Sequence, residues 1–567
     1  MHAGRLVLFL LTALILSVPD TSAQAEDQTC PRPPTGATAS SPAELRSRNG
    51  ALRASLSFRN SQAGDGHARY CYIAGDGSQS PTLRLNPGDL LILTLKNEIS
   101  LAAGGMMKHP ATRSSSCSNG IRMMDASSTN LHFHGLAIPP KCHQDETVTT
   151  LVSSGAPFEY RFRVPPDVPP GLYWYHPHVH GFSEEQVLGG ASGALIVEGI
   201  ERANKPVAGL PERILVIRDQ NISSAKPDPN RPGKDLSVNF VPILYPDPQP
   251  AVIQMRPSER EFWRVLNASA DTYLDLKIVF NNVPQFMGVV ALDGVPVGYA
   301  DGSARNRVLW ESHIFLPPGG RAEFVFNGPP EGVKAALLTQ AVETGPVYDN
   351  DSPPPPGTVS GQTAGDDDNT PARTLATIVS SSAAPEAPSR LPGLVVALAP
   401  SSPAHLAPDQ RAIAPLCAVT PTRQRKFYFS EKLRDPRDPN SPTIFYITEE
   451  GKTPAAYDPA STVPNVVVRQ GDVEDWLIEN RSRETHAFHI HQTHFLILER
   501  HGVPVQESYL RDTINVPYWD GFSPQYPSIK LRMDFRDPNI VGTFPYHCHI
   551  LQHEDGGMMG TIRVEPR

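Results

Sequence analysis

The sequence has little charge, few cysteines and almost no long apolar runs. Charged residues make up only 19% of the 567 residues, whereas proline (59) and glycine (42) are abundant. This composition argues against long solvent-facing helices and favours many short strands joined by turns. The net charge of −9 is mild for this length, so neither nucleic acid nor an anionic membrane surface is expected as a partner.

The one prominent apolar run lies at the N-terminus. Arg5 precedes the run Leu6–Leu16, and the small polar stretch TSAQA follows it. This pattern predicts a secretory signal peptide over residues 1–25 rather than a membrane anchor, because the run is short for a span. No later segment is apolar enough to cross a bilayer. We therefore expect an exported, periplasmic or secreted protein with no membrane span in its mature chain, and we expect it to be a monomer.

The cysteines are too few for a disulfide scaffold. If Cys548 is a functional thiol, five cysteines remain that an oxidising compartment could pair, namely Cys30, Cys71, Cys117, Cys142 and Cys417. One or two disulfides and at least one free thiol are then expected. Their connectivity stays open, with a preference for the pair Cys117 and Cys142 because these two bracket a histidine motif.

A twelve-residue pattern occurs three times, as NPGDLLILTLKN (residues 86–97), RPSEREFWRVLN (256–267) and RQGDVEDWLIEN (469–480). Each copy is a turn followed by a strand with apolar residues two apart, and each ends in asparagine. Copies so far apart imply three similar β domains rather than a short solenoid repeat.

Composition places the domain boundaries. We expect a first domain over residues 26–200, a second over 201–345 and a third over 409–567. Between the last two lies a region rich in Pro, Gly, Asp and Ser, residues 346–408, which we interpret as a linker because it has little apolar surface to bury. The expected fold class is all-β.

Ten of the nineteen histidines are assigned to four short motifs, LHFHG (131–135), YHPHVHG (175–181, of which His176 and His178 count), HAFHIH (486–491) and HCHILQH (547–553). Each motif contains His-x-His, and in a strand this spacing puts both imidazoles on one face. Two motifs lie in the first domain and two in the third. Eight imidazoles converging there exceed the needs of one metal ion and fit a cluster of about three, and imidazole alone leaves Cu, Zn, Fe and Ni possible.

The same alternation separates Cys548 from its neighbours. His547 and His549 point one way and Cys548 points the other, while His486 lies on the opposite face from His489. His553 and a methionine follow Cys548 in what we expect to be a returning loop. Two histidines, one cysteine and a weak axial methionine make the electron-transfer site of blue copper proteins, whereas zinc favours four stronger ligands.

The four motifs, in this order, resemble the copper-binding signatures of the multicopper oxidases, the laccase-like proteins with three cupredoxin domains. RDTINVP (511–517) and HEDGGMMG (553–560) are also similar to this family, the second to its bacterial laccases and cuprous oxidases. The resemblance covers nearly the whole mature chain and implies three cupredoxin-like Greek-key β-sandwich or barrel domains. It further implies a copper-dependent oxidoreductase holding four copper ions, one of type 1, one of type 2 and two of type 3.

The resemblance assigns a metal to twelve residues. The type 1 copper would take His486, Cys548 and His553, with Met558 as the axial ligand and Met559 as the alternative. The type 2 copper would take His132 and His489. The type 3 pair would take His134, His176, His178, His491, His547 and His549. His180 and His494 extend two of the motifs but receive no metal.

The resemblance also implies the reaction. A small reducing substrate gives single electrons to the type 1 copper, and O2 is reduced to water at the other three. Asp145 and Glu554 resemble family acids that supply protons, with Glu146 as the competitor of Asp145. The expected reductant is a phenol or aromatic amine, and the alternative is a metallo-oxidase acting on Cu(I), Fe(II) or Mn(II) in envelope metal homeostasis. An inactive envelope protein and a copper nitrite reductase fit less well, because the ligand set is complete and both neighbours of Cys548 are histidines.

Overall fold

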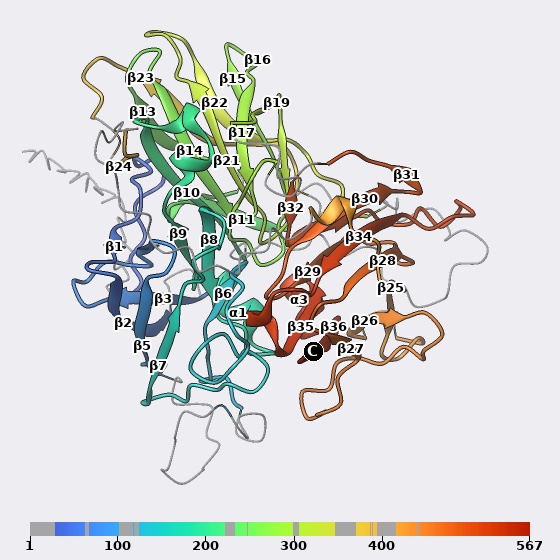
Figure 1. The fold of residues 1–567 in the computed structure, drawn as a ribbon. Helices are drawn as coiled ribbons and strands as arrows, with labels where there is room; N and C mark the ends of the chain where they lie inside the picture. Colours follow the sequence, from blue (N-terminus) through green and yellow to red (C-terminus); the bar gives the residue numbers. More distant parts are fainter. Residues whose placement is uncertain are drawn as a thin grey trace, which may run out of the picture.

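In the computed structural model the described residues are mostly β, and their strands form six sheets (Figure 1). Helices are short and few in the described chain: α1 (Ser183–Leu188), α2 (Ile200–Ala203), α3 (Leu551–Asp555) and the 3-10 turns Lys205–Val207, Leu416–Ala418 and Pro538–Ile540. The prediction of an all-β chain is therefore confirmed. The structure describes residues 29–62, 67–100, 117, 124–221, 233–245, 248–298, 306–345, 370–385, 387, 389–393, 415–438, 441–507 and 509–567.

The first domain contains two sheets. The first holds, in spatial order, β1 (Glu44–Arg46), β4 (Thr82–Leu85), β9 (Gly193–Val197), β8 (Gly171–His176) and β6 (His132–His134). The second holds β3 (Ala68–Ala74), β2 (Ala51–Gln62), β5 (Leu90–Asn97) and β7 (Pro157–Arg163). Side chains from both sheets share one core cluster, which includes Leu93 of β5 and Leu195 of β9.

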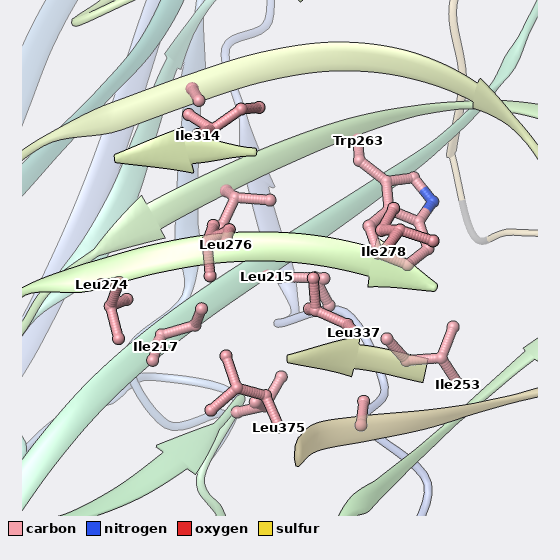
Figure 2. Packing of buried hydrophobic residues seen from close by; sticks show 14 of the residues in the cluster. Leu215, Ile217, Ile253, Trp263, Leu274, Leu276, Ile278, Ile314, Leu337 and Leu375 are labelled. Carbon is pink, nitrogen blue, oxygen red and sulfur yellow. The ribbon is translucent and has the colours of Figure 1, made fainter. Parts of the chain in front are cut away.

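The second domain also packs two sheets around a core. The first holds β12 (Val241–Ile243), β11 (Lys234–Val238), β10 (Pro211–Asn221), β14 (Arg260–Asn267), β21 (Arg321–Asn327), β17 (Met287–Leu292), β18 (Val295–Pro296), β19 (Leu309–Glu311) and β24 (Ser389–Arg390). The other holds β13 (Ala251–Met255), β23 (Arg373–Ser380), β22 (Ala335–Thr339), β15 (Leu274–Phe280), β16 (Val283–Pro284) and β20 (Ile314–Leu316). Figure 2 shows side chains from both sheets in one core cluster, among them Trp263 of β14 and Ile278 of β15.

The third domain repeats the two-sheet plan, in the orange to red strands of Figure 1. One sheet holds β26 (Thr443–Glu449), β25 (Arg423–Leu433), β28 (Val473–Asn480), β34 (Ser528–Asp534), β30 (Phe495–Arg500), β31 (Val503–Pro504) and β32 (Leu510–Arg511). The other holds β27 (Val466–Arg469), β36 (Met559–Glu565), β35 (Gly542–Cys548), β29 (His486–Ile490) and β33 (Thr513–Val516).

The three sequence repeats form equivalent strands. β5, β14 and β28 each run parallel to a long strand that precedes them, namely β2, β10 and β25. Each also pairs antiparallel with a strand that follows it, namely β7, β21 and β34. The repeat therefore marks the same position in three domains of similar plan.

The asparagine that ends each repeat has a structural reason. Asn97, Asn267 and Asn480 are fully buried, and the side-chain amide of each donates to backbone carbonyls of segments that follow. Asn480 donates to Glu484 O at 2.7 Å and to Val516 O at 3.2 Å. A buried amide with these partners satisfies its own two donors and ties the strand end to the segments that follow it. In the third domain this anchors the loop that leads to His486.

Two predicted boundaries need correction. Part of the predicted linker 346–408 belongs to the second domain, because β23 pairs with β13 and β22, and β24 pairs with β10. Leu375, Ala376 and Ile378 are buried in the core of this domain, a short apolar run that the flanking Pro- and Ser-rich stretches hid in the sequence. Residues near the start of the predicted first domain also join the second, since Ala39 N donates to Val252 O of β13.

The structure tests the cysteine pairing but not the predicted signal peptide. The predicted signal peptide lies outside the described residues. Within the part of the chain that is described, no helix is both long and apolar enough to span a membrane. Disulfides join Cys30 to Cys71 and Cys117 to Cys142, the second being the pair that the sequence favoured. Cys417 is free and exposed, and Cys548 is free and buried.

Candidate metal centre

Strand pairing brings the four histidine motifs together two by two. In the first domain β6 pairs antiparallel with β8, so that His132 lies opposite His176. In the third domain β29 pairs antiparallel with β35, so that His489 lies opposite His547. The two domains then meet ring on ring: the imidazole of His132 stacks on that of His491, with 3.8 Å between ring centroids. The cluster therefore lies at the interface between the first and third domains.

The ring nitrogens of these eight histidines gather in three groups, the first two sharing His134, and in each group the nitrogens lie within 4.8 Å of one another. The groups are His132, His134 and His489, then His134, His176 and His549, and finally His178, His491 and His547. In the third group the Nε2 atom of His547 lies 3.3 Å from that of His178 and 3.2 Å from that of His491. Imidazole lone pairs directed at one another are unfavourable unless a proton or a cation lies between them.

The electrostatics of the cluster favour neutral rings. All eight are buried, and burial, reinforced by neighbouring imidazoles, lowers the pKa of most of them, that of His547 to about 3. Neutral imidazole is the form that binds metal. The residues present thus fit a metal cluster: the rings lie close together and are buried away from water, and burial favours the neutral form of most of them.

Hydrogen bonds on the outer nitrogens orient the rings. The Nδ1 atoms of His132, His176 and His489 lie 3.1, 2.9 and 2.8 Å from Asp145, Pro177 O and Asp512 O. Their Nε2 atoms are buried and have no hydrogen-bond partner among the described residues. Such an outer partner is the usual support of a metal-bound histidine, because it sets the tautomer and the direction of the free nitrogen.

A second site lies behind the first, on the other face of β35. The Sγ atom of Cys548 lies 3.7 Å from Nδ1 of His486 and 3.7 Å from Nδ1 of His553, and these two nitrogens are 3.1 Å apart. Their outer Nε2 atoms lie 2.6 Å from Ser482 Oγ and 3.2 Å from Glu484 Oε1. Two imidazoles and a thiol held at such distances match the His2Cys donor set of blue copper.

The two methionines of the returning loop lie on different faces. Met559 pairs with His547 across the β35–β36 ladder and lines a small cavity with Asn130 and His178. Met558 is fully buried in the same core cluster as Cys548, and its carbonyl accepts the Cys548 amide at 3.1 Å. This geometry favours Met558 over Met559 as the thioether beside the thiol.

The two predicted acids both contact the cluster. Asp145 is fully buried, lies 3.1 Å from His132 Nδ1, and accepts hydrogen bonds from Phe133 N and Gln492 Nε2. Its competitor Glu146 instead accepts from the amides of residues 148 and 149 and from Thr150 Oγ1, so it stabilises a loop. Glu554 is fully buried, with its two oxygens 3.6 Å from His178 Nδ1 and 3.6 Å from His547 Nδ1.

Several supporting residues were not found by sequence reasoning. Asp512 is part of RDTINVP, which suggests no role for it, and no motif marks Gln492, Ser482 or Glu484. Ser482 and Glu484 lie four and two residues before His486, so proximity in sequence was the one available signal. The two histidines predicted to lack a metal have other contacts: His180 packs on the ring of Tyr457, and His494 donates to Asp293 O at 3.0 Å.

Comparison with known proteins places these sites in a family. Two family models described as multicopper oxidase match residues 118–202 and 436–567, the segments that carry all four histidine motifs. A multicopper oxidase of Staphylococcus haemolyticus is 24% identical over 501 residues, covering 85% of this chain and 81% of its own. A Bacillus subtilis laccase is 30% identical over 121 residues, 19% of this chain and 22% of its own.

A solved structure extends the match to the fold. The multicopper oxidase of Campylobacter jejuni, described as a metallo-oxidase, superposes with a TM-score of 0.61 at 23% identity, covering 94% of this chain and 96% of that one. This likeness confirms the cupredoxin-like architecture expected for the three domains. With family models over the histidine motifs, relatives along most of the chain and a shared fold, the chain belongs to the multicopper oxidase family and is an oxidoreductase that uses copper.

Proposed function

We propose that this chain is a laccase-like oxidase that takes single electrons from phenolic or related aromatic donors and reduces O2 to water. The position of Cys548 carries the proposal. Its thiol lies among the donors of one site, while its two chain neighbours, His547 and His549, belong to the interdomain cluster. One short strand therefore joins a site suited to single-electron uptake with a cluster large enough for several metal ions.

Twelve residues would hold four copper ions. His486, Cys548 and His553, with Met558, would hold the type 1 ion, and His132 with His489 the type 2 ion. His134, His176 and His549 would hold one type 3 ion, and His178, His491 and His547 the other, which matches two of the ring-nitrogen groups. When bound, copper would accept single electrons at the Cys548 site and deliver four of them to O2 at the cluster.

Two acids have distinct roles in this proposal. Asp145 accepts the Nδ1 proton of His132 and so keeps Nε2 of that ring free. Burial raises the pKa of Glu554 well above the usual range of a carboxyl group and so favours its protonated form. Since it lies beside both His178 and His547, Glu554 is the candidate that gives protons to the cluster during oxygen reduction.

An exposed loop that is linked to the Cys548 site through Ser482 supports an aromatic donor. Ser482, whose hydroxyl contacts His486, also accepts the Trp519 amide through its carbonyl at 2.9 Å. Trp519 begins an aromatic loop in which Phe522 is 71% exposed and Tyr526 is 38% exposed, the latter in edge contact with Trp519. Exposed aromatic rings fixed in this way offer faces and edges on which a phenol can pack.

One observation favours metal-ion oxidation as the second candidate. Glu484 lies 3.2 Å from His553 Nε2, and its side chain keeps 11% of its surface exposed. A carboxylate that links a ligand histidine to solvent would attract Cu(I), Fe(II) or Mn(II). The two candidates therefore depend on different residues beside the same site.

Steady-state rates of the copper-loaded protein on a neutral phenol, Cu(I), Fe(II) and Mn(II) test the choice. We expect the highest kcat/KM for the phenol. Glu484→Gln removes a negative charge, so it should lower kcat/KM for the cations about 10-fold and leave that for the phenol within about 3-fold. Phe522→Ala is the opposing control and should lower kcat/KM for the phenol about 3-fold to 10-fold, with the cations unaffected.

The opposite pattern identifies the second candidate. If a metal ion is the best reductant and Glu484→Gln lowers its rate while Phe522→Ala has no effect, the chain is a metallo-oxidase. A copper-replete protein that consumes no O2 with any of the four reductants would contradict both proposals.

We also propose that the protein works in an exported, oxidising compartment. The two disulfides support this, because such bonds persist in the periplasm and outside cells and are rare in the reducing cytosol. They agree with the predicted signal peptide over residues 1–25.

A further inference from the structure

We infer that Arg321, a residue of the second domain, positions two histidines of the interdomain cluster by holding the carboxylate of Asp512. None of the twelve predicted copper ligands lies in the second domain. The list of ligands alone therefore gives that domain no role at the metal sites. The inference rests on the proposed function, in which the cluster binds copper, and it assigns the second domain a role there.

The ion pair between Arg321 and Asp512 is short and buried. Arg321 is the first residue of β21, and its Nη1 and Nη2 atoms donate to the two oxygens of Asp512 at 2.7 and 2.6 Å. Both side chains are fully buried. Two parallel hydrogen bonds of this kind keep a carboxylate ionised and also fix its orientation. A lysine would keep the charge but would not fix the orientation in this way.

Further contacts fix the guanidinium itself. Its Nη1 also donates to Gly319 O at 3.0 Å, and its Nε donates to Leu172 O of β8 at 3.3 Å. The Arg321 amide donates to Asp293 Oδ1 at 2.9 Å. The guanidinium therefore touches segments of all three domains, with Leu172 from the first, Gly319 from the second and Asp512 from the third.

The fixed carboxylate of Asp512 in turn orients the ring of His134. Its Oδ1 atom lies 3.1 Å from His134 Nε2, and since a carboxylate paired with arginine is ionised and can only accept, Nε2 of His134 carries the proton. The His134 Nδ1 atom is then the free donor, and it is buried without a hydrogen-bond partner in the described chain. This is the opposite nitrogen from the one left free in His132, His176 and His489.

The same residue also holds His489. The backbone carbonyl of Asp512 accepts the Nδ1 proton of His489 at 2.8 Å, and Thr513 Oγ1 donates to Asp512 Oδ1 at 2.8 Å. A rotation of the Asp512 carboxylate would therefore disturb one histidine directly and a second through the adjoining backbone. Arg321 acts on both rings through Asp512 and is a positioning residue.

The turn before Arg321 supports this account. Gly319 has φ +82°, and a Cβ atom added there would lie 2.8 Å from Nε2 of His549. The backbone of the second domain thus lies directly against a third ring of the cluster. A side chain at this position would push against His549, so the close approach requires glycine.

The chain offers a matched control in Arg264. It lies on β14 opposite Glu323 of β21, two residues from Arg321, and is also fully buried. It pairs with Glu212 and Glu323, and no described contact joins it to a histidine. Replacing it with lysine disturbs a buried ion pair of the same kind without touching the cluster.

The test compares Arg321→Lys with Arg264→Lys in the full, copper-loaded chain. The readouts are copper per protein, the intense visible absorption of the Cys548 site, and the affinity for copper measured by competition with a chelator. Loss of an outer partner of a metal ligand costs about 10-fold to 100-fold in affinity. We expect Arg321→Lys to show this loss at the cluster while its visible absorption stays at the wild-type level. Arg264→Lys should unfold at a lower temperature but keep all its copper.

Either of two outcomes would overturn the inference. One is a folded Arg321→Lys variant with wild-type copper content and affinity, and the other is an equal loss of cluster copper in Arg264→Lys. If Arg321→Lys does not fold, Asp512→Asn replaces it under the same criteria, because this change keeps the volume and removes the charge. Failure of the proposed function would differ, since wild-type protein would then lack the visible absorption or bind fewer than four copper ions.

Discussion

Cys548→Ser is expected to fold normally and to lose both the intense visible absorption and all turnover. The thiolate is the soft donor that the copper of this site requires, and a serine hydroxyl does not replace it. The side chain lies fully buried in the core of the third domain, and the two residues are similar in size. Burying the hydroxyl should therefore cost only about 1–3 kcal/mol. Visible absorption, oxygen consumption and thermal unfolding of the copper-loaded variant measure the three effects.

The matched control is the same change at the other free thiol. Cys417 is exposed and is not among the residues that gather at the two sites, so Cys417→Ser should keep wild-type colour and turnover. Normal colour in Cys548→Ser would remove the thiol from the copper site. Equal losses in the two variants would point to a general effect of thiol removal.

Glu554→Gln is expected to slow oxygen reduction about 100-fold to 10,000-fold, the range found when a general acid is removed. The amide keeps the shape of the side chain beside His178 and His547 but has no acidic proton. In the wild-type protein burial raises the pKa of Glu554 and favours its protonated form, and the protonated fraction falls as the pH rises through that pKa. The wild-type rate should therefore fall at high pH, whereas the slow rate of Glu554→Gln should not follow this titration.

Solvent isotope effects sharpen this test. Wild-type oxygen reduction should be slower in D2O, and Glu554→Gln should lose that dependence. Glu146→Gln is the control, because the described hydrogen bonds of this acid come from loop atoms and its loss should lower stability without changing the rate. A Glu554→Gln variant with the wild-type rate and pH profile would exclude Glu554 as the proton donor.

Side-chain alternation made the two sites predictable from sequence. The step of one residue between His547 and Cys548 is a change of face in β35, and the ladder to β29 places His489 beside His547 and Phe488 beside Cys548. The three repeats were equally informative, since β5, β14 and β28 occupy equivalent places in their domains. Period-two patterns of this kind are local, so they can be recognised in a sequence without knowing which distant segments are in contact.

Contacts between distant segments were not predictable in this way. Arg321 and Asp512 are 191 residues apart, and neither lies in a histidine motif. Their pairing depends on how the second and third domains pack, which no periodicity encodes. The same reason explains β23, whose short apolar run reads as part of a linker until its partners β13 and β22 are known.

Anomalous diffraction at the copper edge, from crystals of the copper-loaded protein, would locate every metal site. We expect four copper peaks. One lies beside Cys548 between His486 and His553, and three lie among the eight histidines between the first and third domains. A map with no peak beside Cys548, or with a single ion in place of the cluster, would contradict this assignment.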